Sequence, residues 1–115
     1  MLYLHDGRNV FDAATSFSGE RGVDETLDQL HASGQDAGGA IVVAVDNGGE
    51  YRADEYIPWP SAALKDQPHR GGQGSQYVDF LVYTLKSYID AHYRTRPEAA
   101  HTAIAGSSLG GLISL

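Results

Sequence analysis

The chain has 115 residues, a formal net charge of −7 and no cysteine. This length allows one ordinary domain with a real core, and the 42% hydrophobic content is that of a folded protein rather than a disordered one. The acidic balance, without a run of Lys or Arg, argues against nucleic-acid and anionic-membrane partners, and the lack of cysteine excludes disulfides, thiolate zinc sites and cysteine nucleophiles.

Targeting signals are not evident in the sequence. No apolar stretch reaches the length of a transmembrane helix. The opening MLYLHDG lacks the basic region of a signal peptide and turns polar after four residues. We therefore expect a cytoplasmic protein with no membrane partner.

The first half of the chain predicts a strand, a helix and a second strand. Leu2–Leu4 is a short apolar run that ends at the turn sequence HDGRN. The segment GVDETLDQLHASG, residues 22–34, predicts a helix, because apolar side chains recur at spacings of four and three and acidic residues open the first turn. Ala40–Val45 is apolar throughout, which predicts a parallel strand covered on both faces.

The second half predicts a long loop, a helix, a strand and the start of a helix. Residues 47–74 lack periodicity and are expected to form a loop that is functional or packed on itself. Ser75 is the expected N-cap of a helix over residues 76–93. Its predicted core stripe consists of Tyr77, Phe80, Leu81, Leu85, Tyr88 and Ile89. Thr102–Ala105 is a short strand, and the alternation of strands and helices predicts an α/β fold with a parallel sheet.

The sequence Gly106-Ser107-Ser108-Leu109-Gly110 fits the nucleophile elbow G-x-S-x-G. A nucleophile on a sharp strand-to-helix turn requires small neighbours, which Gly106 and Gly110 supply. The N–H of Leu109 is then able to hold the oxyanion of a tetrahedral intermediate. A bare match is weak, but here an apolar strand precedes the motif and an apolar helix follows it.

Five segments in order carry a resemblance to a known family: LYLHDGRNVFD, GVDETL, NGGEYRADEYIPW, YVDFLVYTLKSYIDAHYRTRPE and IAGSSLGGLISL. Together they resemble the putative-esterase branch of the α/β-hydrolases, which includes siderophore esterases of the enterochelin type and feruloyl esterases. The resemblance covers nearly the whole chain and does not single out a substrate.

This resemblance implies a role for particular residues. Ser108 matches the family nucleophile, and Leu109 matches one backbone oxyanion donor. The HDGR turn matches the second oxyanion loop, in which the N–H of Arg8 is the donor. The chain would then hold three central strands of a partial α/β-hydrolase fold, a three-stranded parallel sheet with crossover helices, in the spatial order second, first, third.

A serine nucleophile also needs a base and an acid, which follow the serine in α/β-hydrolases. No Asp, Glu or His follows Ser108 within this sequence. We therefore expect residues 1–115 to be the central part of one α/β-hydrolase domain, truncated at both ends and inactive alone.

The predicted function is serine-dependent hydrolysis of a small-molecule carboxylic ester, without metal or organic cofactor. Two alternatives stay open: an acyltransferase of the same fold, or a non-catalytic binding module that keeps the elbow as structure. His31, His69, His92 and His101 show no metal-ligand spacing.

Further polar and aromatic residues have structural interpretations. His5 is expected to pack against or hydrogen-bond the oxyanion loop, and Asp46 to form a turn. Arg52 and Glu55 are expected to pair and hold the long loop. Tyr56 and Trp59 are expected either to line an acyl pocket or to anchor the loop on the sheet, and the sequence does not decide between these.

Overall fold

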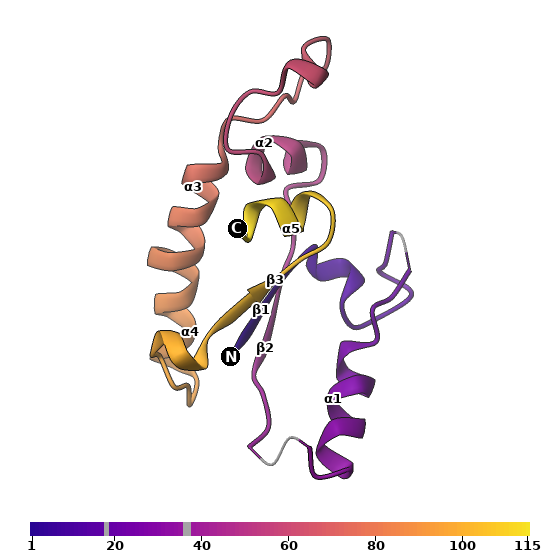
Figure 1. Cartoon of the computed structure of the whole chain (residues 1–115), viewed down its shortest axis with the longest axis vertical. Helices are drawn as coiled ribbons and strands as arrows, with labels where there is room; N and C mark the ends of the chain where they lie inside the picture. Colours follow the sequence, from indigo (N-terminus) through magenta and orange to yellow (C-terminus); the bar gives the residue numbers. More distant parts are fainter. Residues whose placement is uncertain (18, 36–37) are drawn as a thin grey trace.

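A computed structural model of the chain describes residues 1–17, 19–35 and 38–115. Within these residues a three-stranded sheet is formed by β1 (Leu2–His5), β2 (Val42–Val45) and β3 (Ala103–Ala105). The strands are parallel and lie in the order β2-β1-β3 (Figure 1). The predicted α/β class and the predicted spatial order are thereby confirmed.

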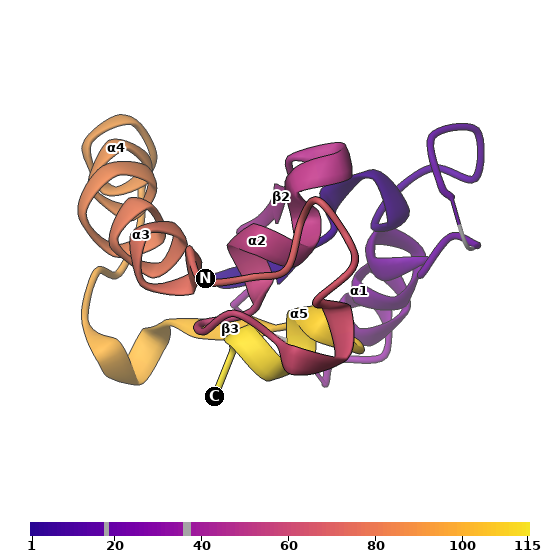
Figure 2. The same ribbon diagram turned by 90° about the horizontal axis from the view of Figure 1, so that it is seen from above.

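Helices cover the two faces of the sheet, as a parallel sheet requires (Figures 1 and 2). On one side lies α1 (Val23–Ala32). On the other lies a long helix composed of α3 (Gly74–Asp79), a π-helical segment (Phe80–Leu85) and α4 (Lys86–His92). No helix in the described part of the chain has the length and apolar character needed to cross a membrane.

The predicted first helix is confirmed as α1. It begins after Gly22, whose φ of +56° suits glycine, and Asp24 and Glu25 occupy its first turn. Its apolar residues Val23 and Leu27 are half-buried, and no residue of α1 is fully buried. This helix therefore packs on the sheet more loosely than the long helix does.

The prediction that the second strand is covered on both faces was wrong. In β2, Val45 is buried, whereas the other three residues are only half-buried. The cause is topological, because β2 pairs with β1 alone and forms one edge of the sheet in the described part of the chain.

Residues 47–74, expected to form a loop that is functional or packed on itself, contain short helical elements that the sequence did not predict. The segment contains a 3₁₀ turn (Gly49–Tyr51), the helix α2 (Arg52–Tyr56) and a second 3₁₀ turn (Ala62–Leu64). These elements are too short to show a periodic pattern in the sequence.

The long helix begins at Gly74 rather than after the predicted cap Ser75. Gln73 occupies the N-cap position, and the Ser75 hydroxyl donates to the side chain of Gln76. A Cβ on Gly74 would lie 2.7 Å from the Cα of Pro58, so the helix start packs directly on the preceding loop. That tertiary contact extends the helix beyond its sequence signal.

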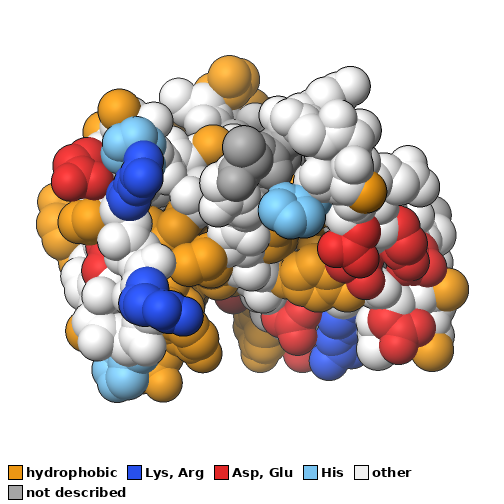
Figure 3. Space-filling model, turned by 90° about the horizontal axis from the view of Figure 1, so that it is seen from below, with side chains coloured by type: hydrophobic (Ala, Val, Ile, Leu, Met, Phe, Trp, Pro, Cys, Tyr) orange, Lys and Arg blue, Asp and Glu red, His pale blue; other side chains and the backbone are white. Residues whose placement is uncertain are grey.

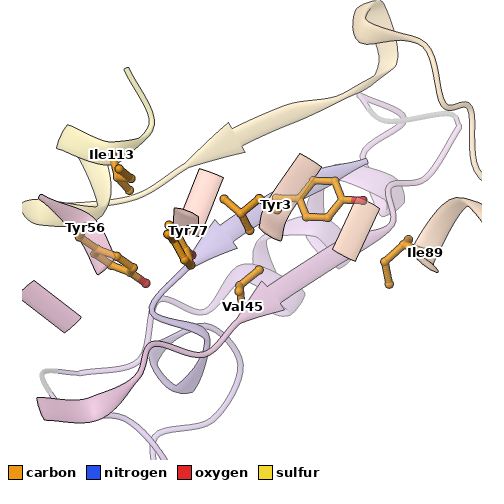
Figure 4. Close-up of a cluster of buried hydrophobic side chains, with 7 residues drawn as sticks. Tyr3, Val45, Tyr56, Tyr77, Ile89 and Ile113 are labelled. Atoms are coloured by element: carbon orange, nitrogen blue, oxygen red, sulfur yellow. The ribbon is translucent and has the colours of Figure 1, made fainter. Parts of the chain in front are cut away.

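The core lies between the sheet, the long helix and α5 (Leu109–Ile113) (Figure 4). Its buried members are Tyr3, Val45, Tyr56, Tyr77, Leu81, Ile89 and Ile113. The predicted core stripe of the long helix is therefore only partly confirmed, because Phe80 and Tyr88 are 42% and 55% exposed. Only one side of this helix packs on the sheet, so residues at the flanks of the stripe remain in solvent.

Candidate functional site

Three polar turns lie at one edge of the sheet, because the carboxyl ends of parallel strands meet there. Residues 6–9 follow β1, residues 46–48 follow β2 and residues 106–108 follow β3. Open α/β sheets bind their ligands at this edge, so these turns form the candidate site.

Ser108 lies in the turn between β3 and α5. Its backbone has φ +55° and ψ −124°, a combination that side-chain-bearing residues rarely adopt and that costs about 1–3 kcal/mol. The residue is exposed, and among the described residues nothing forms a hydrogen bond with its hydroxyl. The fold thus holds an accessible hydroxyl in a strained position directly before a helix.

The glycines on either side of Ser108 are required by close packing. A Cβ on Gly106 would lie 2.5 Å from the carbonyl carbon of Gly110. A Cβ on Gly110 would lie 3.2 Å from the Cβ of His5, so the start of α5 also contacts the end of β1. The steric reason expected for both glycines is present in the structure.

Arg8 lies in a 3₁₀ turn (Gly7–Asn9) directly after β1. Its side chain is 77% exposed and ends 3.8 Å from the carboxylate of Asp46, which is a surface pair of little energetic weight. The backbone of the turn is closed by hydrogen bonds from Asn9 N to Asp6 O and from Val10 N to Gly7 O. Arg8 therefore lies in the turn after β1, and Leu109 opens α5 directly after the turn that follows the neighbouring strand β3.

A buried carboxylate lies at the centre of the site. Asp6 is 4% exposed and accepts two hydrogen bonds from Arg52, at 2.6 and 2.8 Å, and a third from the Asn47 side chain at 2.8 Å. Arg21 Nη2 lies 3.9 Å from the same carboxylate. We refer to Asp6, Arg21, Asn47 and Arg52 as the Asp6 cluster.

The pKa of Asp6 reflects this environment. Burial by itself would raise the pKa of the carboxyl group, but the hydrogen bonds from Arg52 and Asn47 and the charges of Arg52 and Arg21 outweigh it, so the pKa lies below its ordinary value. Asp6 is therefore ionised at neutral pH and balances the charge of Arg52.

His5 is held in the core beneath the site. It is 1% exposed, and its Nδ1 lies 2.7 Å from the hydroxyl of Tyr77. Burial lowers the pKa of His5, although the neighbouring Asp6 opposes the shift. The ring also packs against Tyr56, whose hydroxyl accepts from the backbone N–H of Asp6. The expected structural role for His5 is confirmed.

Comparison with known proteins shows the family to which the chain belongs. Residues 1–115 match the family described as Putative esterase. The chain belongs to the putative esterase family. It is 28% identical over 115 residues to a Bacillus subtilis (strain 168) protein named "Uncharacterized protein YbbA", across 99% of this chain and 41% of that protein. The chain thus spans about two fifths of the length of this relative. No solved structure matches the chain.

In this member of the putative esterase family, the expected pairing of Arg52 with Glu55 was wrong. Arg52 pairs with Asp6, and Glu55 instead accepts a hydrogen bond from the backbone N–H of Gly48 at 2.9 Å. The buried carboxylate of Asp6 accepts two hydrogen bonds from Arg52, so this guanidinium group is engaged there rather than with Glu55. Each partner still holds the long segment onto the sheet edge.

The two aromatic residues whose roles the sequence left open differ in burial. Tyr56 is fully buried in the core, so it anchors the segment on the sheet. Trp59, by contrast, is 62% exposed. The loop beyond α2 is instead held by Asp54, whose carboxylate lies 2.7 Å from His69 Nδ1 and accepts from the N–H of Gly71.

One acidic group in the described residues has the spacing of a metal site. The carboxylates of Glu20, Asp24 and Glu25 lie within 4.8 Å of one another, and all three residues are exposed. Asp24 and Glu25 stand in the first turn of α1, where negative charge stabilises the helix. The helix terminus therefore gives Asp24 and Glu25 a structural role that needs no bound ion.

Proposed function

We propose that this protein hydrolyses carboxylic esters through an acyl-enzyme formed on Ser108. The observation that carries the proposal is the backbone of Ser108, which exposes the hydroxyl on a strained turn between β3 and α5. Strain of this kind clusters at functional sites. Membership of the putative esterase family supports ester hydrolysis as the reaction class.

In the proposed reaction, the Ser108 oxygen attacks the ester carbonyl carbon and gives its proton to a base. The carbonyl oxygen becomes an oxyanion, which the N–H groups of Arg8 and Leu109 would stabilise. The tetrahedral intermediate then collapses, and the alcohol leaves with a proton. Water then attacks the carbonyl carbon of the acyl-enzyme. Collapse of this second tetrahedral intermediate releases the carboxylic acid and returns the proton to the Ser108 oxygen.

The base and acid of this reaction are proposed to come from outside residues 1–115. Within the described residues, His5 is buried against Tyr77, and His69 is held by Asp54 in the loop after α2. Neither contacts Ser108. The greater length of the Bacillus subtilis relative is consistent with further catalytic residues elsewhere in such proteins.

The test uses protein expressed from its complete reading frame. Ser108→Ala is expected to lower the hydrolysis of p-nitrophenyl acetate by at least about 1,000-fold, because the nucleophile is removed. A fluorophosphonate probe should label Ser108 in the wild-type protein, as located by peptide mass spectrometry.

The matched control is Ser75→Ala, which removes an exposed hydroxyl on the long helix. It should retain wild-type labelling and turnover. Labelling that persists in Ser108→Ala would contradict the proposal. Labelling without hydrolysis, together with ester formation when an alcohol acceptor is added, would indicate an acyltransferase.

A further inference from the structure

Arg21 joins the turn that contains Arg8 to the turn that directly precedes Leu109, the other proposed oxyanion donor. It lies just before α1, and its backbone N–H donates to the carbonyl of Asn9 at 2.8 Å. Its guanidinium group reaches the other turn, where Nη2 donates to the hydroxyl of Ser107 at 2.8 Å. Nη1 makes a longer contact of 3.4 Å to the carbonyl of His5, at the end of β1.

The turns that Arg21 joins are both strained. Among the described residues, Asp6 and Ser108 are the two non-glycine residues with positive φ, at +57° and +55°. Asp6 opens the turn that contains Arg8, and Ser108 immediately follows Ser107. Such backbones persist only where surrounding contacts over-determine them. Arg21 contacts the side chain of Asp6 and the hydroxyl of Ser107, the residue before Ser108.

The position of Arg21 is itself fixed by charge and burial. Its side chain is 26% exposed and lies 3.9 Å from the buried carboxylate of Asp6. Asp6 is held in turn by the paired hydrogen bonds from Arg52. Because a guanidinium group is planar and always charged, it can contact Asp6, His5 and Ser107 in one fixed arrangement.

We propose that Arg21 is a positioning residue that sets the spacing between the Arg8 turn and the Ser108 turn through its bridge to Ser107. The inference rests on the proposed esterase function. Oxyanion donors act only when they lie about 2.7–3.1 Å from the developing charge, so a small change in that spacing weakens them in the transition state. Arg21 itself touches no reacting atom.

Two variants test the bridge in protein from the complete reading frame. Ser107→Ala removes the acceptor hydroxyl with little risk to folding, and it should lower kcat for p-nitrophenyl acetate by about 3- to 10-fold with KM nearly unchanged. Arg21→Ala should lower kcat by about 10- to 100-fold for the same reason. A loss confined to kcat indicates a contact that matters in the transition state rather than in substrate binding.

The double variant tests whether the two residues act as one unit. Arg21→Ala combined with Ser107→Ala should be no slower than Arg21→Ala alone, because the same bridge is already broken. Guanidinium chloride far below its denaturing range should partly restore kcat in Arg21→Ala, whereas sodium chloride at equal ionic strength should not. Arg94→Ala, an exposed arginine at the far end of the sheet, is the control and should match wild type.

The outcomes separate this inference from the function on which it rests. Wild-type protein without Ser108-dependent turnover would overturn both. Full wild-type kcat in Ser107→Ala would overturn the bridge alone, even if Arg21→Ala failed to fold. Strictly additive losses in the double variant, without rescue by guanidinium, would also overturn it while leaving the esterase function intact.

Discussion

At the scale of single residues, Asp6 shows how a buried charge organises the site. One carboxylate that is 4% exposed lies among two guanidinium groups and one amide. Burying a charge is costly unless it is paired and hydrogen-bonded, and Arg52 supplies both. The turn that carries Arg8 is therefore fixed by electrostatics as well as by its backbone.

Replacing Asp6 should destabilise the protein because its partners lose their counter-charge. We expect Asp6→Asn to lower the free energy of unfolding by about 2–3 kcal/mol at pH 7. Asp46→Asn is the control, since its pair with Arg8 is largely exposed, and it should cost no more than about 0.5 kcal/mol. Urea denaturation of both variants measures the difference, and equal losses would contradict the role of the Asp6 cluster.

The lowered pKa of Asp6 gives this prediction a pH dependence. A carboxyl group whose folded-state pKa lies below its ordinary value of 3.8 stabilises the fold above that pH and loses the contribution as the pH falls through the folded-state value. The difference between wild type and Asp6→Asn should therefore be full at pH 7 and shrink below about pH 3.8. A difference in the free energy of unfolding that grows as the pH falls would contradict this prediction.

At the scale of elements, the turn between β3 and α5 depends on backbone sterics. The chain reverses within residues 106–110 so tightly that Gly106 has no room for a side chain. The same tightness forces Ser108 into a positive φ. Strand, turn and helix therefore form one unit, in which the position of the serine follows from the two glycines.

Adding one methyl group to this turn should disrupt it. Gly106→Ala would place a Cβ 2.5 Å from the backbone of Gly110, so we expect loss of at least about 3 kcal/mol of stability together with loss of fluorophosphonate labelling. Gly38→Ala, where nothing lies within 4 Å of the added atom, should be neutral or slightly stabilising. Normal labelling in Gly106→Ala would show that the turn adapts.

At the scale of the whole molecule, residues 1–115 are extended and rich in exposed apolar surface. The radius of gyration is 15.5 Å, against about 13 Å for a compact domain of this length. The accessible surface is 7500 Å², against about 6,100 Å² for a compact protein of this mass. Apolar side chains reach the surface on both sides of a hollow at the lower end of the molecule (Figure 3).

This surface predicts the behaviour of residues 1–115 expressed alone. Phe80, Val82, Tyr83 and Ile104 are between 41% and 74% exposed, and β2 and β3 are edges in the described sheet. We expect the isolated segment to bind a hydrophobic dye, to aggregate and to give negligible ester turnover. A sharp two-state thermal transition of the isolated segment would contradict the expected dye binding and aggregation. Turnover abolished by Ser108→Ala would show that a histidine within the segment supplies the base.

Much of the fold could be predicted because its signals are local. Apolar runs predicted the three strands, helical spacing predicted α1 and the long helix, and two glycines around Ser108 predicted the sharp turn. Steric limits and side-chain periodicity act over a few residues, so they can be read along the chain. The short helices of residues 49–64 and the helix start at Gly74 were missed because tertiary packing, not periodicity, stabilises them.

The connections within the candidate site were decided by the tertiary structure alone. The position of Asp6 directly after β1 gave some signal, because ligands and their supporting residues gather at the carboxyl ends of parallel strands. Nothing in the sequence pointed to Arg21, whose bridge to Ser107 spans 86 positions, or to the pairing of Asp6 with Arg52 across 46 positions. The sequence by itself determined the order of elements and the place of Ser108. The partners of the buried charges were determined only when parallel pairing brought three separate turns to one edge of the sheet.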